Sequence, residues 1–427
     1  MDARPREDRQ GTSRSTYLWN TASSMLMAFQ SVIMLVVVTH VCDVSTAGVL
    51  TLAYAHANLF LNLGKYGVRN YQVSDVERRH SFIAYAKLRV LTSTLMLVFG
   101  SAFLLSPFGD TGYSGYSASK SATIFVMLLF KCIDALEDAV HGNYQQNGHL
   151  DVGAKVLCFR LSTTIAIFAL LVCLARDLLL SLSIATAYTA LYFLAETAWV
   201  WRRYGLPSFD AGGSSKALPL LKACFPLFLS LFLLFYIGNI PKYTIDTLMD
   251  DAAQAIYGFI AMPVFVVGLL SNFIFNPIVA SLALQWSKGK VDAFSKRFLW
   301  QSIVILLITV GCIVGAWTIG APVLGALYNT NLYPYRIDLI VLLMGGGLLA
   351  LATLFTTGIT IMRNQRMLTF GYLLVSLIAR ILCPVMVRAE GIDGASWSYL
   401  WVMLCLTLWC LGGFLMGLRS NKGSTSD

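Results

Sequence analysis

The sequence predicts an all-α, polytopic integral membrane protein with about twelve transmembrane helices in two six-helix lobes. Hydrophobic residues make up 57% of the 427 residues and charged residues only 12%, and the mean hydropathy is +0.68. Soluble domains carry about 25% charged residues. About twelve apolar segments are long enough to cross a ~30 Å hydrocarbon core as helices. Spanning β-strands would show alternating segments of about ten residues instead.

The predicted helices fall into two groups. A polar tail at 1–16 precedes the first group at 17–203, and a tail at 419–427 follows the second group at 218–418. Gly, Ser and Pro collect at 204–217, a composition typical of a linker. Because each group holds an even number of spans, the two would be parallel repeats related by an axis along the membrane normal.

The net charge of +9 indicates orientation rather than nucleic-acid binding. When the N-terminus is placed in the cytoplasm, most of the 31 Lys and Arg residues fall in or beside inner loops. Positively charged residues mark the cytoplasmic side of membrane proteins. We therefore expect a multi-pass protein with both termini in the cytoplasm and no nucleic-acid partner.

The helix predicted at 121–143 carries the most informative charges. Four of its residues follow an i, i+3, i+7, i+10 spacing and share one helix face. These residues are Lys131, Asp134, Asp138 and His141. Glu137 points away from this face. Ionisable groups at membrane depth cost several kcal/mol and normally face a bundle interior or a wet cavity.

Two interpretations of these charges stay open. In one, the stripe lines a transport pathway, and Asp134, Asp138 and Glu137 are candidates for coupling transport to H⁺ or Na⁺. In the other, Lys131 and Asp134 neutralise each other and hold helices together. Burial and neighbouring carboxylates disfavour the charged form of such a carboxylate, whereas a cation such as Lys131 favours it.

Other residues in the predicted spans are candidate ligands for an anionic substrate. A guanidinium offers a bidentate match to phosphate oxygens, which favours Arg160 and Arg380. Snorkelling to the interface is the alternative for Arg160. The candidate substrate-binding residues are Arg160, Arg380, Lys131, Lys222, Asn20, Gln30 and Asn58. The three amide residues also suit hydrogen bonds between helices.

Signatures of enzymes and metal sites were not found in the sequence. It contains no phosphate-binding loop, HExxH motif or nucleophile elbow. Its nine cysteines and five histidines show no ligand spacing. A membrane-embedded glycan polymerase or transferase would need a large outer loop, and the predicted outer loops are short. We therefore expect a protein that is not an enzyme and holds no cofactor or metal.

Three stretches carry a family resemblance. They are NLGKYGVRNYQVSD at 62–75, ALEDAVHGNYQQNGHLDVGAK at 135–155, and NIPKYTID at 239–246, which continues to Asn276 and Pro277. In these stretches and over nearly its whole length, the chain resembles the polysaccharide and teichoic-acid flippases of the multidrug/oligosaccharidyl-lipid/polysaccharide exporter superfamily. Lys65 and Arg69 lie in the first stretch and are expected to form a cytoplasmic gate.

The resemblance implies two lobes in a V around a cationic cavity. Such proteins move polyprenyl-pyrophosphate-linked glycans across the bacterial cytoplasmic membrane by alternating access, for cell-surface polysaccharide synthesis. The implied partners are the bilayer, the lipid-linked glycan and polysaccharide-assembly proteins. Arginines common in the family's first helix are represented here only by Arg14, which lies before the membrane. The alternatives are a drug or cation antiporter of the same superfamily, a polymerase or transferase, and a scaffold that transports nothing.

Overall fold

A computed structural model describes the chain at residues 14–75, 79–105, 116–205, 216–275, 278–362 and 364–423. Every regular element within these ranges is a helix, which confirms the predicted all-α class. Residues 206–215 of the predicted linker lie outside the described residues, as do residues 1–13 and 424–427 of the predicted tails.

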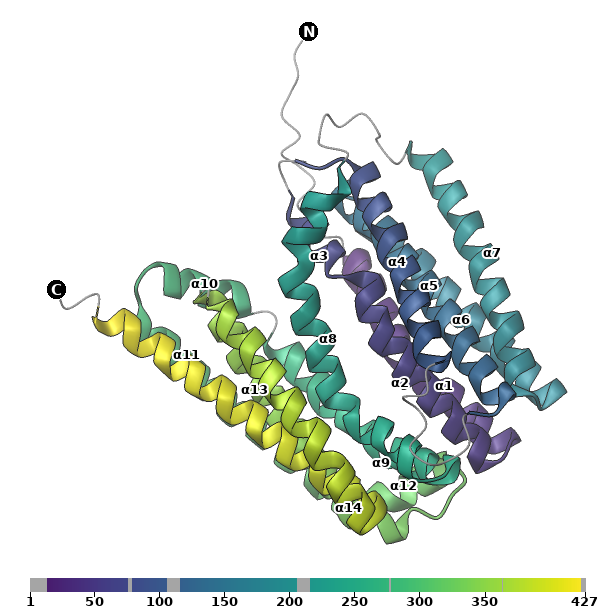
Figure 1. The fold of residues 1–427 in the computed structure, drawn as a ribbon. Helices are drawn as coiled ribbons and strands as arrows, with labels where there is room; N and C mark the ends of the chain where they lie inside the picture. Colours follow the sequence, from purple (N-terminus) through teal and green to yellow (C-terminus); the bar gives the residue numbers. More distant parts are fainter. Residues whose placement is uncertain are drawn as a thin grey trace. The chain divides into compact units, whose positions relative to one another are not determined.

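The helices follow one another with short connections (Figure 1). The earlier helices are α1 (Arg14–Val41), α2 (Val44–Lys65), α3 (Val68–Ser74), α4 (Phe82–Leu105), α5 (Ala118–Gln146), α6 (Leu150–Ala175) and α7 (Leu178–Tyr204). The later ones are α8 (Ala217–Leu248), α9 (Asp251–Phe275), α10 (Val279–Ser287), α11 (Val291–Gly315), α12 (Ala321–Leu327), α13 (Arg336–Ile361) and α14 (Gln365–Gly423). A π-helical turn joins α11 to α12 at Ala316–Gly320, and a 3-10 turn precedes α13 at Tyr333–Tyr335.

Ten helical segments in the described ranges are long and apolar enough to cross a membrane. The charged helix α5 is not among them. Helix α14 is counted as one of the ten segments. Gly391 interrupts it with φ 60° and ψ −125°, and each of the two parts is long enough to cross a membrane. With α5 and both parts of α14 counted separately, the spans agree with the predicted number of about twelve.

The contacts divide the chain into two compact units. Unit 1 comprises Met1–Cys42, His56–Pro107 and Tyr116–Phe228. Unit 2 comprises Asp43–Ala55, Phe108–Gly115 and Leu229–Asp427. The helices α2 and α8 each contribute one part to each unit.

Unit 1 is assembled around α5. This helix packs against α3, α4, α6 and α7, while α1 packs against α6. Small residues allow the close approaches: a Cβ on Gly142 of α5 would lie 2.5 Å from the Gln72 side-chain oxygen of α3. Because several helices surround α5, its polar residues must find their partners inside the protein.

The turn between α2 and α3 places charged residues beside α5. Gly67 precedes α3 with φ 66°, a left-handed conformation that favours glycine. A Cβ there would also lie 2.7 Å from Leu227. The neighbouring Tyr66 stacks on Phe228 at 4.5 Å between ring centroids. This anchored turn holds Lys65 and Arg69 on either side of it.

The connection after α3 is held by the carboxylate of Asp75. Its two oxygens accept hydrogen bonds from the amides of Arg79 and His80, at 3.0 and 3.1 Å, and from the Tyr85 hydroxyl at 2.8 Å. Burial raises the pKa of Asp75, but these bonds together outweigh burial, so its pKa lies below the ordinary value of 3.8.

Replacing Asp75 by Asn is expected to lower the free energy of unfolding by about 1–3 kcal/mol, because charge-assisted hydrogen bonds are lost. A lowered folded-state pKa stabilises the protein above the unfolded-state value and loses that contribution as the pH falls through the folded-state pKa. Thermal unfolding in detergent between pH 7 and 3 should show that the difference in Tm between the unaltered protein and Asp75→Asn becomes smaller below about pH 3.8. A constant gap would contradict this role, and Asp151→Asn, in a surface pair, is the control.

Unit 2 is assembled around α13, which packs against α9, α11 and α14. Three consecutive glycines give each neighbour a close approach. A Cβ at Gly345 would lie 2.5 Å from the Tyr399 ring of α14, one at Gly346 would lie 2.8 Å from Val264 of α9, and one at Gly347 would lie 2.5 Å from Thr309 of α11. Larger residues there would force these helices apart.

Candidate functional site

The candidate site of unit 1 is a set of charged side chains buried around α5. Lys131, Asp134, Glu137 and His141 each retain at most 6% of their surface exposed. Asp138 is nearly as enclosed, with 12% of its side chain exposed. Buried charges are tolerated only when they are paired or bind an ion, and the partners come from five other helices.

The first group, here called the Arg160 cluster, consists of Lys131, Asp134, Glu137 and Arg160. Arg160 of α6 is fully buried, and its Nη2 donates to Asp134 Oδ1 at 2.8 Å and lies 2.7 Å from Glu137 Oε2. Lys131 Nζ donates to the other oxygen of Asp134 at 2.9 Å. Two cations therefore face two carboxylates, and the cluster is electrically balanced.

The second group, the His141 cluster, consists of Glu137, His141 and Glu196. His141 Nε2 lies 3.8 Å from Glu137 Oε1 and 3.7 Å from Glu196 Oε1. Both distances exceed that of a hydrogen bond. Glu196 belongs to α7, so this group joins α5 to a second helix.

The third group, the Asp138 cluster, consists of Asp138, Lys65, Arg69 and Arg89. Asp138 accepts hydrogen bonds from Arg89 Nη2 at 2.8 Å and from Arg69 Nη1 at 3.3 Å. Lys65 lies close enough to interact with Asp138 electrostatically. Arg89 also donates to the carbonyl oxygen of Gly64 at 2.8 Å. Three cations gather around one carboxylate, which leaves a surplus of positive charge.

The members of the Asp138 cluster differ in exposure. The Arg89 side chain is 2% exposed, whereas the Arg69 side chain is 33% exposed. Lys65 is half-buried. Arg69 also donates to Gln145 Oε1 at 3.1 Å. The side chains of Lys65 and Arg69 are therefore the accessible part of the surplus positive charge, while Arg89 is buried beside Asp138.

This arrangement corrects the sequence-based grouping of the α5 charges. The spacing placed Lys131, Asp134, Asp138 and His141 on one helix face and pointed Glu137 away from it, and the prediction for Glu137 is wrong. Glu137 joins the Arg160 and His141 clusters, whereas Asp138 turns to α3 and α4. The prediction from the spacing assumed that α5 has one buried face, but the helices packed around α5 bury more than one of its faces.

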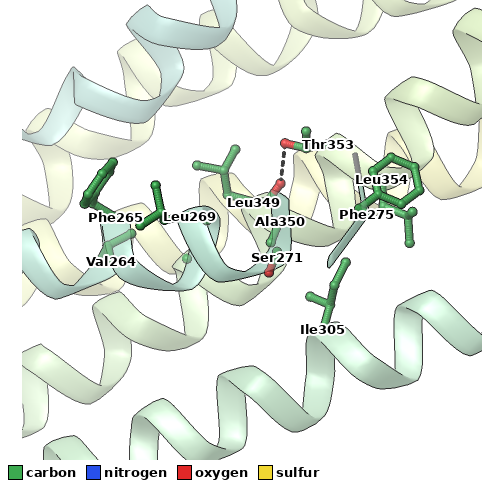
Figure 2. Close-up of a pocket in the computed structure, with 12 residues that line it drawn as sticks. Val264, Phe265, Leu269, Ser271, Phe275, Ile305, Leu349, Ala350, Thr353 and Leu354 are labelled. Atoms are coloured by element: carbon green, nitrogen blue, oxygen red, sulfur yellow. Dashed lines mark hydrogen bonds between the residues drawn. The ribbon is translucent and has the colours of Figure 1, made fainter. Parts of the chain in front are cut away.

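Each of the two units contains cavities of its own. A cavity of about 590 Å³ in unit 1 runs along α6 and α7, and its lining includes Lys155, Phe159, Tyr192, Glu196 and Trp199. A second cavity, of about 270 Å³, lies in unit 2 and is lined by residues of α9, α11 and α13. Figure 2 shows its lining residues. Its hydroxyls, Ser271 and Thr353, donate to carbonyls of their own helices, so this second cavity presents an apolar surface.

Solved structures share this architecture. One is described as the inward-facing conformation of a multidrug resistance MATE family transporter of the MOP superfamily, with a TM-score of 0.66, 12% identity, and coverage of 95% of this chain and 99% of that chain. A second is a lipid II flippase MurJ structure, with a TM-score of 0.65, 13% identity, and coverage of 93% and 90%. The chain has the fold of these transporters. No family model and no curated protein sequence matches it.

The remaining predicted ligands lie in varied settings. Gln30 of α1 is buried, with its Oε1 at 3.5 Å from Lys131 Nζ. Asn58 of α2 is half-buried, and Asn20 of α1 is exposed. Lys222 of α8 is exposed in unit 1, and Arg380 of α14 is exposed in unit 2. The binding roles assigned to these residues stay predictions.

Two members of the site had no role in the sequence analysis. Arg89 and Glu196 are both ionisable residues inside long apolar helices, and this feature could have marked them as candidates. Their partners lie 49 and 55 positions away in the chain, at Asp138 and His141. No local spacing relates residues that far apart, so only the packing of α4 and α7 on α5 brings them into the site.

Proposed function

We propose that this chain is a flippase that moves a polyprenyl-pyrophosphate-linked oligosaccharide or teichoic-acid precursor across the bacterial cytoplasmic membrane. It would work by alternating access, with both termini in the cytoplasm, in cell-surface polysaccharide synthesis and in association with the assembly proteins of that process. The observation that carries the proposal is the surplus of positive charge in the Asp138 cluster. A diphosphate requires such accessible cations.

The Asp138 cluster suits the diphosphate better than the Arg160 cluster does. Arg160 and Lys131 already face Asp134 and Glu137, and they are buried. Lys65 has no hydrogen bond or ion pair within the described part of the chain, and Arg69 has one-third of its side chain exposed. We therefore place the diphosphate at Lys65 and Arg69, the pair expected from the sequence to form a gate.

The second candidate is an antiporter for drugs or organic cations, because the fold is shared with multidrug transporters as well as with a lipid II flippase. A cationic cargo would need accessible carboxylates. Glu196 lines a cavity of unit 1 and contacts His141. The other three carboxylates are less available: Asp134 and Glu137 are buried, Asp138 keeps 12% of its side chain exposed, and each faces at least one Lys or Arg. This observation favours the anionic lipid.

Coupling to H⁺ or Na⁺ through Asp134, Asp138 and Glu137 stays part of the proposal. Each of these carboxylates holds a cationic side chain within 2.8 Å. An incoming ion would have to displace that partner, so coupling requires the ion pairs to open during transport. Transport that persists after both ion gradients are collapsed would exclude such coupling.

The test of the proposed function measures lipid-linked glycan in cells depleted of the protein. Extracted polyprenyl-linked intermediates are quantified by mass spectrometry, and intact spheroplasts are treated with a membrane-impermeant sugar-modifying reagent. We expect completed units to accumulate protected from the reagent, on the inner leaflet. Accumulation of reactive, outward-facing units would indicate a polymerase or transferase, and no accumulation would favour the antiporter.

A further inference from the structure

The His141 cluster brings three metal-ligating groups together inside unit 1. One oxygen each from Glu137 and Glu196 and one ring nitrogen of His141 all lie within 4.8 Å of one another. The three residues are 2%, 7% and 5% exposed. All three residues are therefore buried between α5 and α7.

Three polar atoms of this cluster, one from each residue, lack hydrogen-bond partners within the described residues. Glu137 Oε1, His141 Nε2 and Glu196 Oε2 have none. Glu196 Oε1 receives only a 3.4 Å contact from the Thr197 hydroxyl. A buried polar atom left without a partner costs about 1–3 kcal/mol, and more when it is charged. An ion bound among these three residues would give the unpartnered atoms a partner.

The spacing of the ligands suits a metal. Glu137 and His141 lie one helical turn apart on α5, so both side chains project from one face, and Glu196 approaches from α7. The nitrogen–oxygen separations are 3.8 and 3.7 Å. A tetrahedral metal with ligand bonds of about 2.0–2.2 Å holds its ligands about 3.3–3.6 Å apart. The nitrogen–oxygen pairs need to close by a few tenths of an ångström, and the two carboxylate oxygens, which lie within 4.8 Å of each other, by up to about 1.5 Å.

The surroundings provide the support that metal ligands need. Ligating carboxylates are themselves hydrogen-bonded in metal sites. Here Arg160 Nη2 lies 2.7 Å from Glu137 Oε2, the oxygen that faces away from His141. Glu196 lines the cavity of about 590 Å³ along α6 and α7. That cavity gives an ion a way to reach the ligands.

We propose that Glu137, His141 and Glu196 bind one divalent transition-metal ion. An imidazole nitrogen suits Zn²⁺ and its neighbours, whereas Mg²⁺ and Ca²⁺ prefer oxygen ligands. Three protein ligands leave a fourth position open. No metal was expected from the sequence, in which Glu196 lies 55 positions from His141. The inference does not depend on the transported substrate.

The test uses the purified full-length protein in detergent, freed of affinity tag and stripped of metal with a chelator. Zn²⁺ binding is measured by equilibrium dialysis with elemental analysis, and Co²⁺ absorption reports the ligand geometry. We expect about one Zn²⁺ per chain. His141→Ala and Glu196→Gln should each weaken binding at least about tenfold, because each removes or weakens a ligand. The controls are His149→Ala and Glu390→Gln, residues outside the cluster, which should leave binding unchanged.

A second readout separates binding from folding. Zn²⁺ should raise the Tm of the unaltered protein, because a ligand that binds only the folded state stabilises it. It should not raise the Tm of Glu196→Gln, a substitution that keeps the shape of the side chain. Absence of stoichiometric Zn²⁺ binding would overturn the proposal and favour a proton shared by the three residues. Binding that His141→Ala leaves intact would overturn it as well.

Discussion

Replacing Arg160 by Ala is expected to lower the free energy of unfolding by about 3–5 kcal/mol, because it leaves buried carboxylates without their cation. Arg160 is fully buried and contacts both Asp134 and Glu137. Asp134 keeps Lys131 as a partner, but Glu137 loses its cation. Thermal and chemical unfolding in detergent, with a chelator present, would show the loss.

Three further variants locate the cause of this loss. Combining Arg160→Ala with Glu137→Gln should recover part of the stability, because the unpaired charge is removed. The free energy of unfolding of Arg160→Lys should lie between that of the unaltered protein and that of Arg160→Ala. An ammonium keeps the positive charge but cannot contact both carboxylates as a guanidinium does. Arg388→Ala, at an exposed position of α14, should change stability little. A stable Arg160→Ala protein that has lost transport would instead return Arg160 to the substrate site.

Replacing both Lys65 and Arg69 by Ala is expected to reduce transport of the lipid-linked glycan about a hundredfold or more, while the protein stays folded and abundant. Charge-assisted hydrogen bonds contribute about 1.5–3 kcal/mol each, so each single substitution should reduce transport about tenfold or more. Stability should persist because Asp138 keeps Arg89 as its partner at 2.8 Å. The measurement is the amount of inner-leaflet glycan in cells that depend on the variant.

The matched control for this pair is Lys155→Ala, which removes a surface cation paired with Asp151 on α6. It should transport normally. Normal transport by the Lys65 and Arg69 double variant would contradict the placement of the diphosphate. If the double variant handles organic cations better than the unaltered protein, the antiporter becomes the favoured function.

The fold class can be predicted from the sequence. The apolar content, the number of spanning segments and the buried charges of the α5 region all follow from composition and residue spacing, because a bilayer leaves the helix as the structure that satisfies the backbone within each segment. It also indicated that Lys131 and Asp134 lie close together, since a three-residue separation places them on one helix face. These are local properties, and local properties can be read from the chain.

The partners of the buried charges depend on how the helices pack in three dimensions. The sequence spacing grouped Asp138 with Asp134 and left Glu137 aside, whereas the packing of α3, α4, α6 and α7 around α5 reversed this grouping. Arg89 and Glu196 gained partners that no spacing relates to them. The reason is physical: a charge inside a membrane protein is stabilised by whichever opposite charge or ion lies nearest in space. That neighbour is set by helix packing rather than by position in the chain.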